Sequence, residues 1–190
     1  MSKNKSIIGV LALQGAVEPH RAHIEACGAT FSAVKTAADF KGVDAFILPG
    51  GESTTMLKLI ERFNLWDALM EQFSAKPVWG ICAGSILLAE TVFSPSQKSF
   101  GLLPMTVQRN GYGRQLDSHH ADIDGYTVSF IRAPVMSGVD ESVTILAEHD
   151  GAPVWVQKGK VMASSFHPEL TQDFPSPMHQ RFIDLVAESA

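Results

Sequence analysis

Residues 77–84 read PVWGICAG, and this stretch decides the fold that we predict for the chain. An apolar run leads into Gly-x-Cys-x-Gly and a second apolar run follows, which predicts a strand, a sharp turn and a helix. This order of elements is typical of a nucleophile elbow, a strained strand-to-helix turn that presents a nucleophile between small residues. Gly80 and Gly84 meet that requirement on either side of Cys82.

On both sides of the elbow, short apolar strands alternate with helical stretches, as in an α/β domain. The predicted strands before and at the elbow cover residues 7–13, 31–34, 44–48 and 78–81, and the predicted helices cover 17–27, 53–63, 66–73, 83–92 and 178–186. Because crossovers of this kind join parallel strands, we expect a mostly parallel open sheet flanked by helices, resembling flavodoxin. Strand-like runs between residues 101 and 166 predict an antiparallel extension of that sheet.

Composition limits the function classes. The chain has 190 residues, 45% of them hydrophobic, which suits one domain over residues 1–190. A net charge of -5 without a long basic run argues against nucleic acid as the partner. The apolar run at residues 7–13 is too short for a signal peptide or a membrane span, and two cysteines make no disulfide framework. We therefore expect a cytoplasmic protein with no membrane partner and no cofactor.

The elbow gives Cys82 a chemical environment suited to attack. Its thiol is expected to lie over the amino end of a helix, where free N–H groups favour a thiolate. The N–H of Ala83 can hold the negative oxygen of a tetrahedral intermediate. The five-residue pattern alone fits a buried, small hydrophobic cysteine between incidental glycines equally well.

Two other predicted strands end in residues of chemical interest. Residues 161–169 (VMASSFHPE) place His167 and Glu169 two positions apart, so that in an extended segment the carboxylate can orient the imidazole. Taken alone, a histidine at a strand end is more often structural. Residues 45–53 (AFILPGGES) bring backbone close to a ligand, and Gly51 can supply a second oxyanion-hole N–H, although a plain tight turn fits as well.

The remaining histidines and the second cysteine suggest no site. His20 and His23 lie one helical turn apart and are interpreted as surface residues. Cys27 is interpreted as core packing. His119 and His120 are adjacent on a predicted strand and so face opposite sides, and we expect no metal site.

These motifs resemble those of class I glutamine amidotransferases, whose triad is Cys, His and Glu in this chain order. Five blocks resemble more closely the glutaminase subunits of pyridoxal 5'-phosphate synthases. The blocks are residues 11–17 (LALQGAV), 49–55 (PGGESTT), 109–115 (RNGYGRQ), 130–134 (FIRAP) and 165–171 (SFHPELT).

The resemblance implies a reaction and a set of residues. Cys82 would attack the side-chain amide of L-glutamine and form a glutamyl-thioester, while His167 moves the proton and Glu169 orients the histidine. The residues that the resemblance places on the substrate are Gly50, Gly51, Glu52, Arg109, Ile131 and Arg132.

The resemblance also implies a partner, a separate barrel-shaped synthase subunit that receives the ammonia for pyridoxal 5'-phosphate (vitamin B6) biosynthesis. Residues 14–17 are a candidate part of the docking surface, although Gln14 also fits an ordinary loop glutamine. Two other classes stay open, a cysteine hydrolase or stress protein resembling the DJ-1 and intracellular-protease group, and a silent subunit that only binds the synthase. The DJ-1 group usually places histidine directly after the elbow cysteine, where this chain has Ala83.

Overall fold

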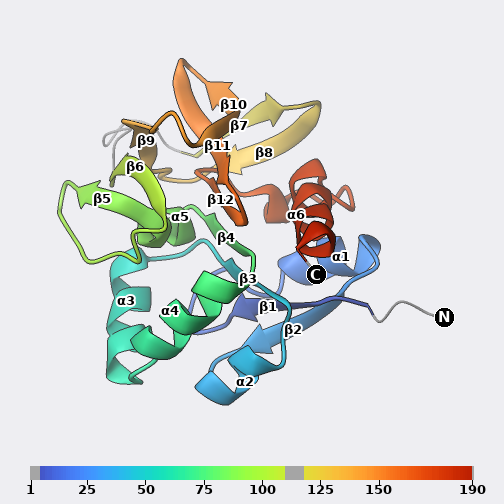
Figure 1. Ribbon diagram of the computed structural model, residues 1–190. Helices are drawn as coiled ribbons and strands as arrows, with labels where there is room; N and C mark the ends of the chain where they lie inside the picture. Colours follow the sequence, from blue (N-terminus) through green and yellow to red (C-terminus); the bar gives the residue numbers. More distant parts are fainter. Residues whose placement is uncertain (1–4, 110–117, 190) are drawn as a thin grey trace.

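A seven-stranded sheet in the order β10-β11-β12-β4-β3-β1-β2 forms the centre of the protein (Figure 1). The structure is a computed structural model that describes residues 5–109 and 118–189. Five neighbouring strands are parallel, as the alternation of strands and helices predicts. These are β2 (Thr30–Val34), β1 (Ile7–Leu11), β3 (Ala45–Leu48), β4 (Val78–Ile81) and β12 (Val161–Ser164). The carboxyl ends of β3, β4 and β12 therefore lie side by side.

Helices cover both faces of this sheet (Figure 1). On one face lie α1 (His20–Ala26) and α6 (Pro177–Glu188). On the other face lie α2 (Ala37–Lys41), α3 (Ser53–Arg62), α4 (Trp66–Ala75) and α5 (Ala83–Leu88). Within the described ranges, no helix is both long and apolar enough to cross a lipid bilayer.

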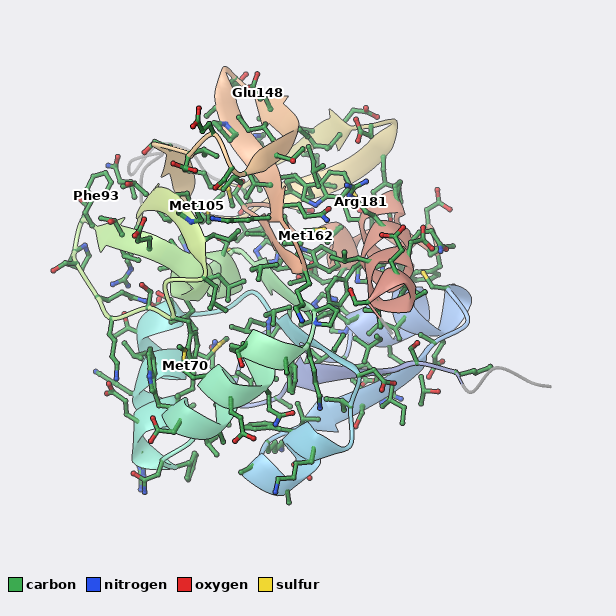
Figure 2. The ribbon with its side chains drawn as sticks, in the orientation of Figure 1. Met70, Phe93, Met105, Glu148, Met162 and Arg181 are labelled. Carbon is green, nitrogen blue, oxygen red and sulfur yellow. The ribbon has the colours of Figure 1, made fainter. Side chains whose placement is uncertain are left out.

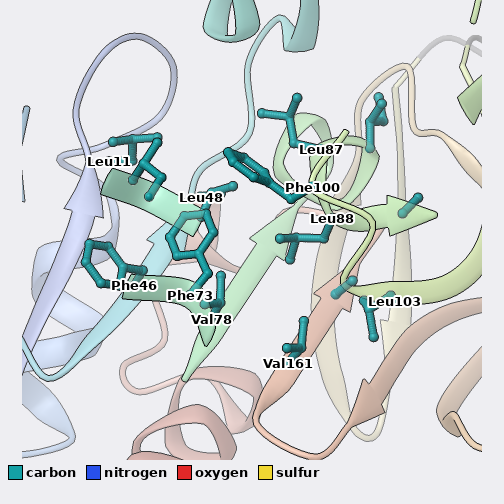
Figure 3. Close-up of a cluster of buried hydrophobic side chains, with 14 of the residues drawn as sticks. Leu11, Phe46, Leu48, Phe73, Val78, Leu87, Leu88, Phe100, Leu103 and Val161 are labelled. Atoms are coloured by element: carbon teal, nitrogen blue, oxygen red, sulfur yellow. The ribbon is translucent and has the colours of Figure 1, made fainter. Parts of the chain in front are cut away.

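The two faces of the sheet carry separate hydrophobic cores because successive strand residues point to opposite sides. In β3, Phe46 and Leu48 enter the core under α3 and α4 (Figure 3), whereas Ile47 enters the core under α1 and α6. A fully buried strand of this kind reads as a continuous apolar run, which is why the sequence predicted it. Figure 2 shows Met162 of β12 in the interior, while Glu148 lies at the periphery.

Helix α5 lies unusually close to the sheet because two glycines lack side chains at the contact. A Cβ on Gly84 would lie 2.1 Å from the carbonyl oxygen of Leu48, and one on Gly80 would lie 2.5 Å from the carbonyl oxygen of Gly84. Neither clash can be relieved by a side-chain rotation, since both partners are backbone atoms. The small residues that the elbow requires thus hold the helix against β3 and β4.

The predicted helix over residues 83–92 is too long. Helix α5 ends at Leu88, and β5 (Ala89–Phe93) follows directly, with Ala89 already extended. Thr91 and Val92 are β-branched residues that pair with β6 (Leu103–Gln108), and this pairing outweighs the weak helical pattern.

The antiparallel extension is confirmed only in part. Two strands, β10 (Thr144–His149) and β11 (Ala152–Lys158), extend the central sheet in that way. Of the others, β6 and β9 (Val135–Ser137) join β5 in a separate sheet, and β7 (His119–Ile123) and β8 (Tyr126–Phe130) form a hairpin. Apolar patterns predict strands but not their partners, so the sequence could not separate the three sheets.

Other boundaries also differ from the prediction. The first strand ends at Leu11, two residues early, and α1 begins only at His20 because Pro19 occupies its N-cap position. The sequence prediction missed α2, whose start is fixed by a capping box between Thr36 and Asp39.

We expect Gly84→Ala to lower the free energy of unfolding by about 2 kcal/mol or more, because the new methyl group overlaps the Leu48 carbonyl oxygen. Gly42→Ala is the matched control, since its Cβ would meet its nearest backbone neighbour at an ordinary 3.6 Å. Urea unfolding of both variants measures the difference. Equal stabilities would show that α5 can move away from the sheet at little cost.

Candidate active site

Cys82 occupies the elbow between β4 and α5, as predicted. Its backbone has φ 48° and ψ -101°, a conformation that is strained for a residue with a side chain. The turn is held by the Cys82 N–H, which donates to the Ser164 carbonyl oxygen at 2.8 Å, and by the Ser85 hydroxyl, which donates to the Cys82 carbonyl oxygen at 2.7 Å. The side chain is buried next to the Ile131 carbonyl oxygen, 3.9 Å from its sulfur.

The His167 imidazole is fixed at the end of the neighbouring strand. Its backbone N–H donates to the Ser129 carbonyl oxygen at 2.8 Å, which ties the segment after β12 to β8. Its Nδ1 lies 2.7 Å from Oε1 of Glu169. The expected extended segment is wrong in detail, because residues Pro168–Leu170 form a 3₁₀ turn. The turn nevertheless brings the carboxylate to the imidazole.

Burial and charge oppose each other in this pair. Burial alone would lower the pKa of His167, but the Cys82 and Glu169 side chains outweigh it and raise this pKa from 6.5 to about 10. Burial alone would raise the pKa of the Glu169 carboxyl. The hydrogen bond from His167 and the charge interactions with His20 and His167 outweigh burial, so this pKa is lowered. A charged imidazolium–carboxylate pair is therefore the favoured state next to Cys82.

The Gly-Gly turn after β3 lies directly against the histidine. A Cβ on Gly50 would lie 2.1 Å from the Cε1 atom of His167, so only glycine leaves room for the ring. A Cβ on Gly51 would lie 2.5 Å from Nε2 of Gln14. The Oε1 atom of Gln14 in turn accepts the Glu52 N–H at 3.1 Å. The loop after β1 thus supports the turn that borders the site.

A narrow cavity opens beside the cysteine. It is lined by Gly51, Glu52, Ser53, Cys82, Ala83, Ile86, Arg109, Ile131, Arg132 and Pro134. The cavity therefore brings together every expected site residue except Gly50, His167 and Glu169, which are not among its lining residues. Arg109 is held by Thr54 Oγ1 at 2.8 Å and Glu52 Oε1 at 3.3 Å. The rest of the predicted arginine block, residues 110–115, lies outside the described residues.

The interpretation of His20 and His23 as surface residues is wrong. Both are fully buried, under α6 and against Trp79 or Phe174. A signal was present in the sequence, since these two histidines and Ile24 share the spacing of a buried helical face. Cys27 is only half-buried, and burial raises the pKa of its thiol to about 11, so it is not a competing nucleophile. In residues 5–109 and 118–189, no three-ligand group suited to a metal ion occurs.

An elbow cysteine and a histidine–carboxylate pair at neighbouring strand ends of a mostly parallel sheet are the arrangement expected of class I glutamine amidotransferases. Residues 10–188 match the model of the SNO glutamine amidotransferase family. The chain belongs to this family.

Curated relatives cover nearly the whole chain and carry one name, "Pyridoxal 5'-phosphate synthase subunit PdxT". The protein from Deinococcus radiodurans is 44% identical, over 96% of this chain and 98% of its own. The protein from Kosmotoga olearia is 42% identical, over 93% and 95%. The protein from Bacillus licheniformis is 44% identical, over 94% of each.

Solved structures agree with the architecture. A crystal structure described as glutamine amidotransferase has a TM-score of 0.86 at 38% identity, and the match covers 95% of this chain and 98% of the other. A putative GMP synthase component from Thermoplasma acidophilum has a TM-score of 0.66 at 13% identity, over 98% and 96%, which shows the shared fold alone.

We expect Glu169→Gln to cost most stability between about pH 4.5 and 6.5 and less as the pH rises toward 10. The raised pKa of His167 stabilises the folded protein fully below pH 6.5, and this stabilisation is lost as the pH rises to about 10. The lowered pKa of Glu169 stabilises the folded protein fully above pH 4.5, and this stabilisation is lost as the pH falls further. Urea unfolding across this range measures the difference.

The exposed Glu71→Gln variant is the control for this titration. A stability difference between wild type and Glu169→Gln that stays constant with pH would contradict a charged pair.

Proposed function

We propose that Cys82, His167 and Glu169 are the catalytic triad with which this glutamine amidotransferase hydrolyses L-glutamine to L-glutamate and ammonia. The observation that carries the proposal is the buried 2.7 Å contact between His167 and Glu169, which follow the strand β12 that pairs with β4, the strand leading into Cys82. A nucleophile, a base and a group that orients the base are thereby placed together, as acyl transfer through a thioester requires.

The reaction has two halves. The Cys82 thiolate attacks the side-chain amide carbon, and the carbonyl oxygen becomes an oxyanion that the N–H groups of Ala83 and Gly51 are proposed to hold. His167 then gives its proton to the nitrogen, the carbon–nitrogen bond breaks, and ammonia leaves a glutamyl-thioester. In the second half, His167 takes a proton from water, the hydroxide attacks the thioester, and glutamate and the thiolate are released.

The cavity offers charges for the amino acid end of the substrate. Arg109 and Arg132 supply cations for the glutamine carboxylate, and Glu52 supplies an anion for its ammonium group. Gly51 and Ile131 line the same cavity. Gly50 is proposed to act on the substrate indirectly, because it lies against the His167 ring.

We further propose that the ammonia passes to a separate synthase subunit, a barrel, for pyridoxal 5'-phosphate biosynthesis. The shared name of the curated relatives supports this partner. Residues 14–17 are the proposed docking loop, because the Ala16 N–H donates to the Gly50 carbonyl oxygen at 2.9 Å and so joins the loop to the catalytic turn. Residues 1–190 form one glutaminase domain in this scheme. The proposed location is the cytoplasm, whose reducing conditions keep Cys82 from being oxidised.

Cys82→Ala is expected to abolish glutamate release from glutamine, measured with and without a pyridoxal 5'-phosphate synthase subunit, while the fold and binding to that subunit remain. Cys27→Ala is the matched control and should keep wild-type activity, since this thiol lies outside the cavity. Hydrolysis that survives in Cys82→Ala would overturn the triad. Hydrolysis that depends on Cys82 but not on the synthase would overturn the partner.

Arg109→Gln should raise KM for glutamine by roughly 10- to 100-fold with a smaller effect on kcat, because it removes a charge-assisted contact to the substrate carboxylate. Steady-state kinetics measure the change. Arg62→Gln, at the exposed end of α3, is the control. An unchanged KM in Arg109→Gln would remove this arginine from the substrate site.

A further inference from the structure

The strand β8 lies outside the central sheet, yet one of its edges is bonded to the segment that carries the His167–Glu169 pair. Its other edge pairs with β7. The Ser129 carbonyl oxygen accepts the His167 N–H at 2.8 Å, and the Ser129 N–H donates to the His167 carbonyl oxygen at 3.4 Å. Two residues earlier, the Thr127 carbonyl oxygen accepts the Thr171 hydroxyl at 2.6 Å. Alternate residues of a strand bond along the same edge, so both contacts lie on the edge opposite β7.

The same line of contacts continues to the elbow cysteine. Ile131, the residue after β8, places its carbonyl oxygen 3.9 Å from the sulfur of Cys82. Ser129 and Ile131 are two residues apart, a spacing of about 7 Å in an extended chain. They contact His167 and Cys82 in succession, although these two residues follow different strands of the central sheet, β12 and β4. The β8 segment therefore bridges the two strand ends.

The start of β8 fastens the chain on the far side of Glu169. The Tyr126 hydroxyl donates to the Asp173 carbonyl oxygen at 2.7 Å and lies 3.3 Å from the Thr171 carbonyl oxygen. Burial raises the pKa of Tyr126 to about 12, so this hydroxyl keeps its proton and stays a donor at neutral pH. Glu169 thus lies between two points at which the chain is bonded to β8, His167 before it and Thr171 after it.

Apolar packing fixes the register of β8. Tyr126, Val128 and Phe130 are each at most 5% exposed and belong to the core under α1 and α6. The Phe130 ring packs on Phe166, the residue before His167, with centroids 5.6 Å apart. A slip of one residue would turn these side chains out of the core, so the register is strongly specified. The contacts along the edge of β8 therefore have fixed positions.

We propose that β8 is a positioning element for the triad, whose edge holds the His167–Glu169 segment at a fixed distance from Cys82, with Tyr126 and Thr171 as positioning residues. This inference rests on the proposed function, since it takes His167 to be the base. Neither positioning residue lines the cavity, so each is expected to act through the backbone that it holds. A base must be held to within a fraction of an ångström to act on a nucleophile, and bonds on both sides of Glu169 provide that restraint.

The test uses two anchor variants, Tyr126→Phe and Thr171→Val, each of which removes one hydroxyl and nearly keeps the shape of the side chain. Thr36→Val is the matched control, because it also removes a threonine hydroxyl bonded to backbone, at the N-cap of α2. With the synthase subunit present, we expect the anchor variants to lower kcat roughly three- to tenfold. KM should change less, because the cavity residue Ile131 follows the opposite end of β8. The control should keep the wild-type kcat.

A second measurement follows the position of Glu169. Burial alone would lower the pKa of His167, but Cys82 and Glu169 raise it to about 10, and His20 of α1 interacts electrostatically with both members of the pair. If the carboxylate moves away from the imidazole, the imidazolium loses stabilisation. An NMR titration of the His167 ring, assigned with His167→Asn, should therefore show a pKa closer to 6.5 in the anchor variants and the wild-type value in the control.

Both changes are required. A wild-type kcat or a wild-type titration in the anchor variants would overturn the proposal. Equal changes in Thr36→Val would also overturn it, because they would indicate a general loss of stability. If one anchor variant does not fold, the other decides. The titration needs neither glutamine nor the synthase, so it tests the position of His167 separately from the triad, whose failure would appear as hydrolysis by Cys82→Ala.

Discussion

The close approach of α5 to β3 and β4 is the constraint on which the rest of the structure depends. Gly84 lets the first turn of the helix rest on the Leu48 carbonyl, and this contact forces the sharp turn at Cys82. The strain at Cys82 persists because every residue of α5 is buried and the turn is bonded to Ser164 and Ser85. The position and the strained backbone of the cysteine therefore share one cause, the packing of a short helix on a sheet.

A second relation links the His167–Glu169 pair to the interior of the protein. Glu169 is a carboxylate at 3% exposure, and burial of such a charge is tolerated only where donors surround it. His167 satisfies one of the two carboxylate oxygens, Oε1, at 2.7 Å. The buried His20 of α1 also helps to lower the pKa of Glu169, so a helix that does not line the cavity contributes to the electrostatics of the pair.

The local motifs of the candidate site could be predicted from the sequence more fully than the pairing of the strands. The elbow, the His-Pro-Glu segment and the Gly-Gly turn are local patterns in which glycine and proline fix the backbone. In the structure Gly50 lies against the His167 ring, and His167 contacts Glu169. Residues 101–166 could not be assigned to three sheets, because alternation predicts a strand without its partner. The burial of His20 was missed for a different reason. A polar residue is normally expected to be exposed. Here a hydrogen bond to His179 of α6, far away in the sequence, offsets the cost of burying the imidazole.

The pairing of β12 with β4 has a consequence for the order in which the protein is made. Trp79 and Ser164 are hydrogen-bonded neighbours, yet 85 positions separate them along the chain. The strands up to β4 and the helices between them depend on nearer contacts and can assemble early, whereas β12 must insert beside a strand that has long left the ribosome. During synthesis the elbow at Cys82 therefore exists before His167, which follows β12, and the two are brought together only when β12 joins the sheet.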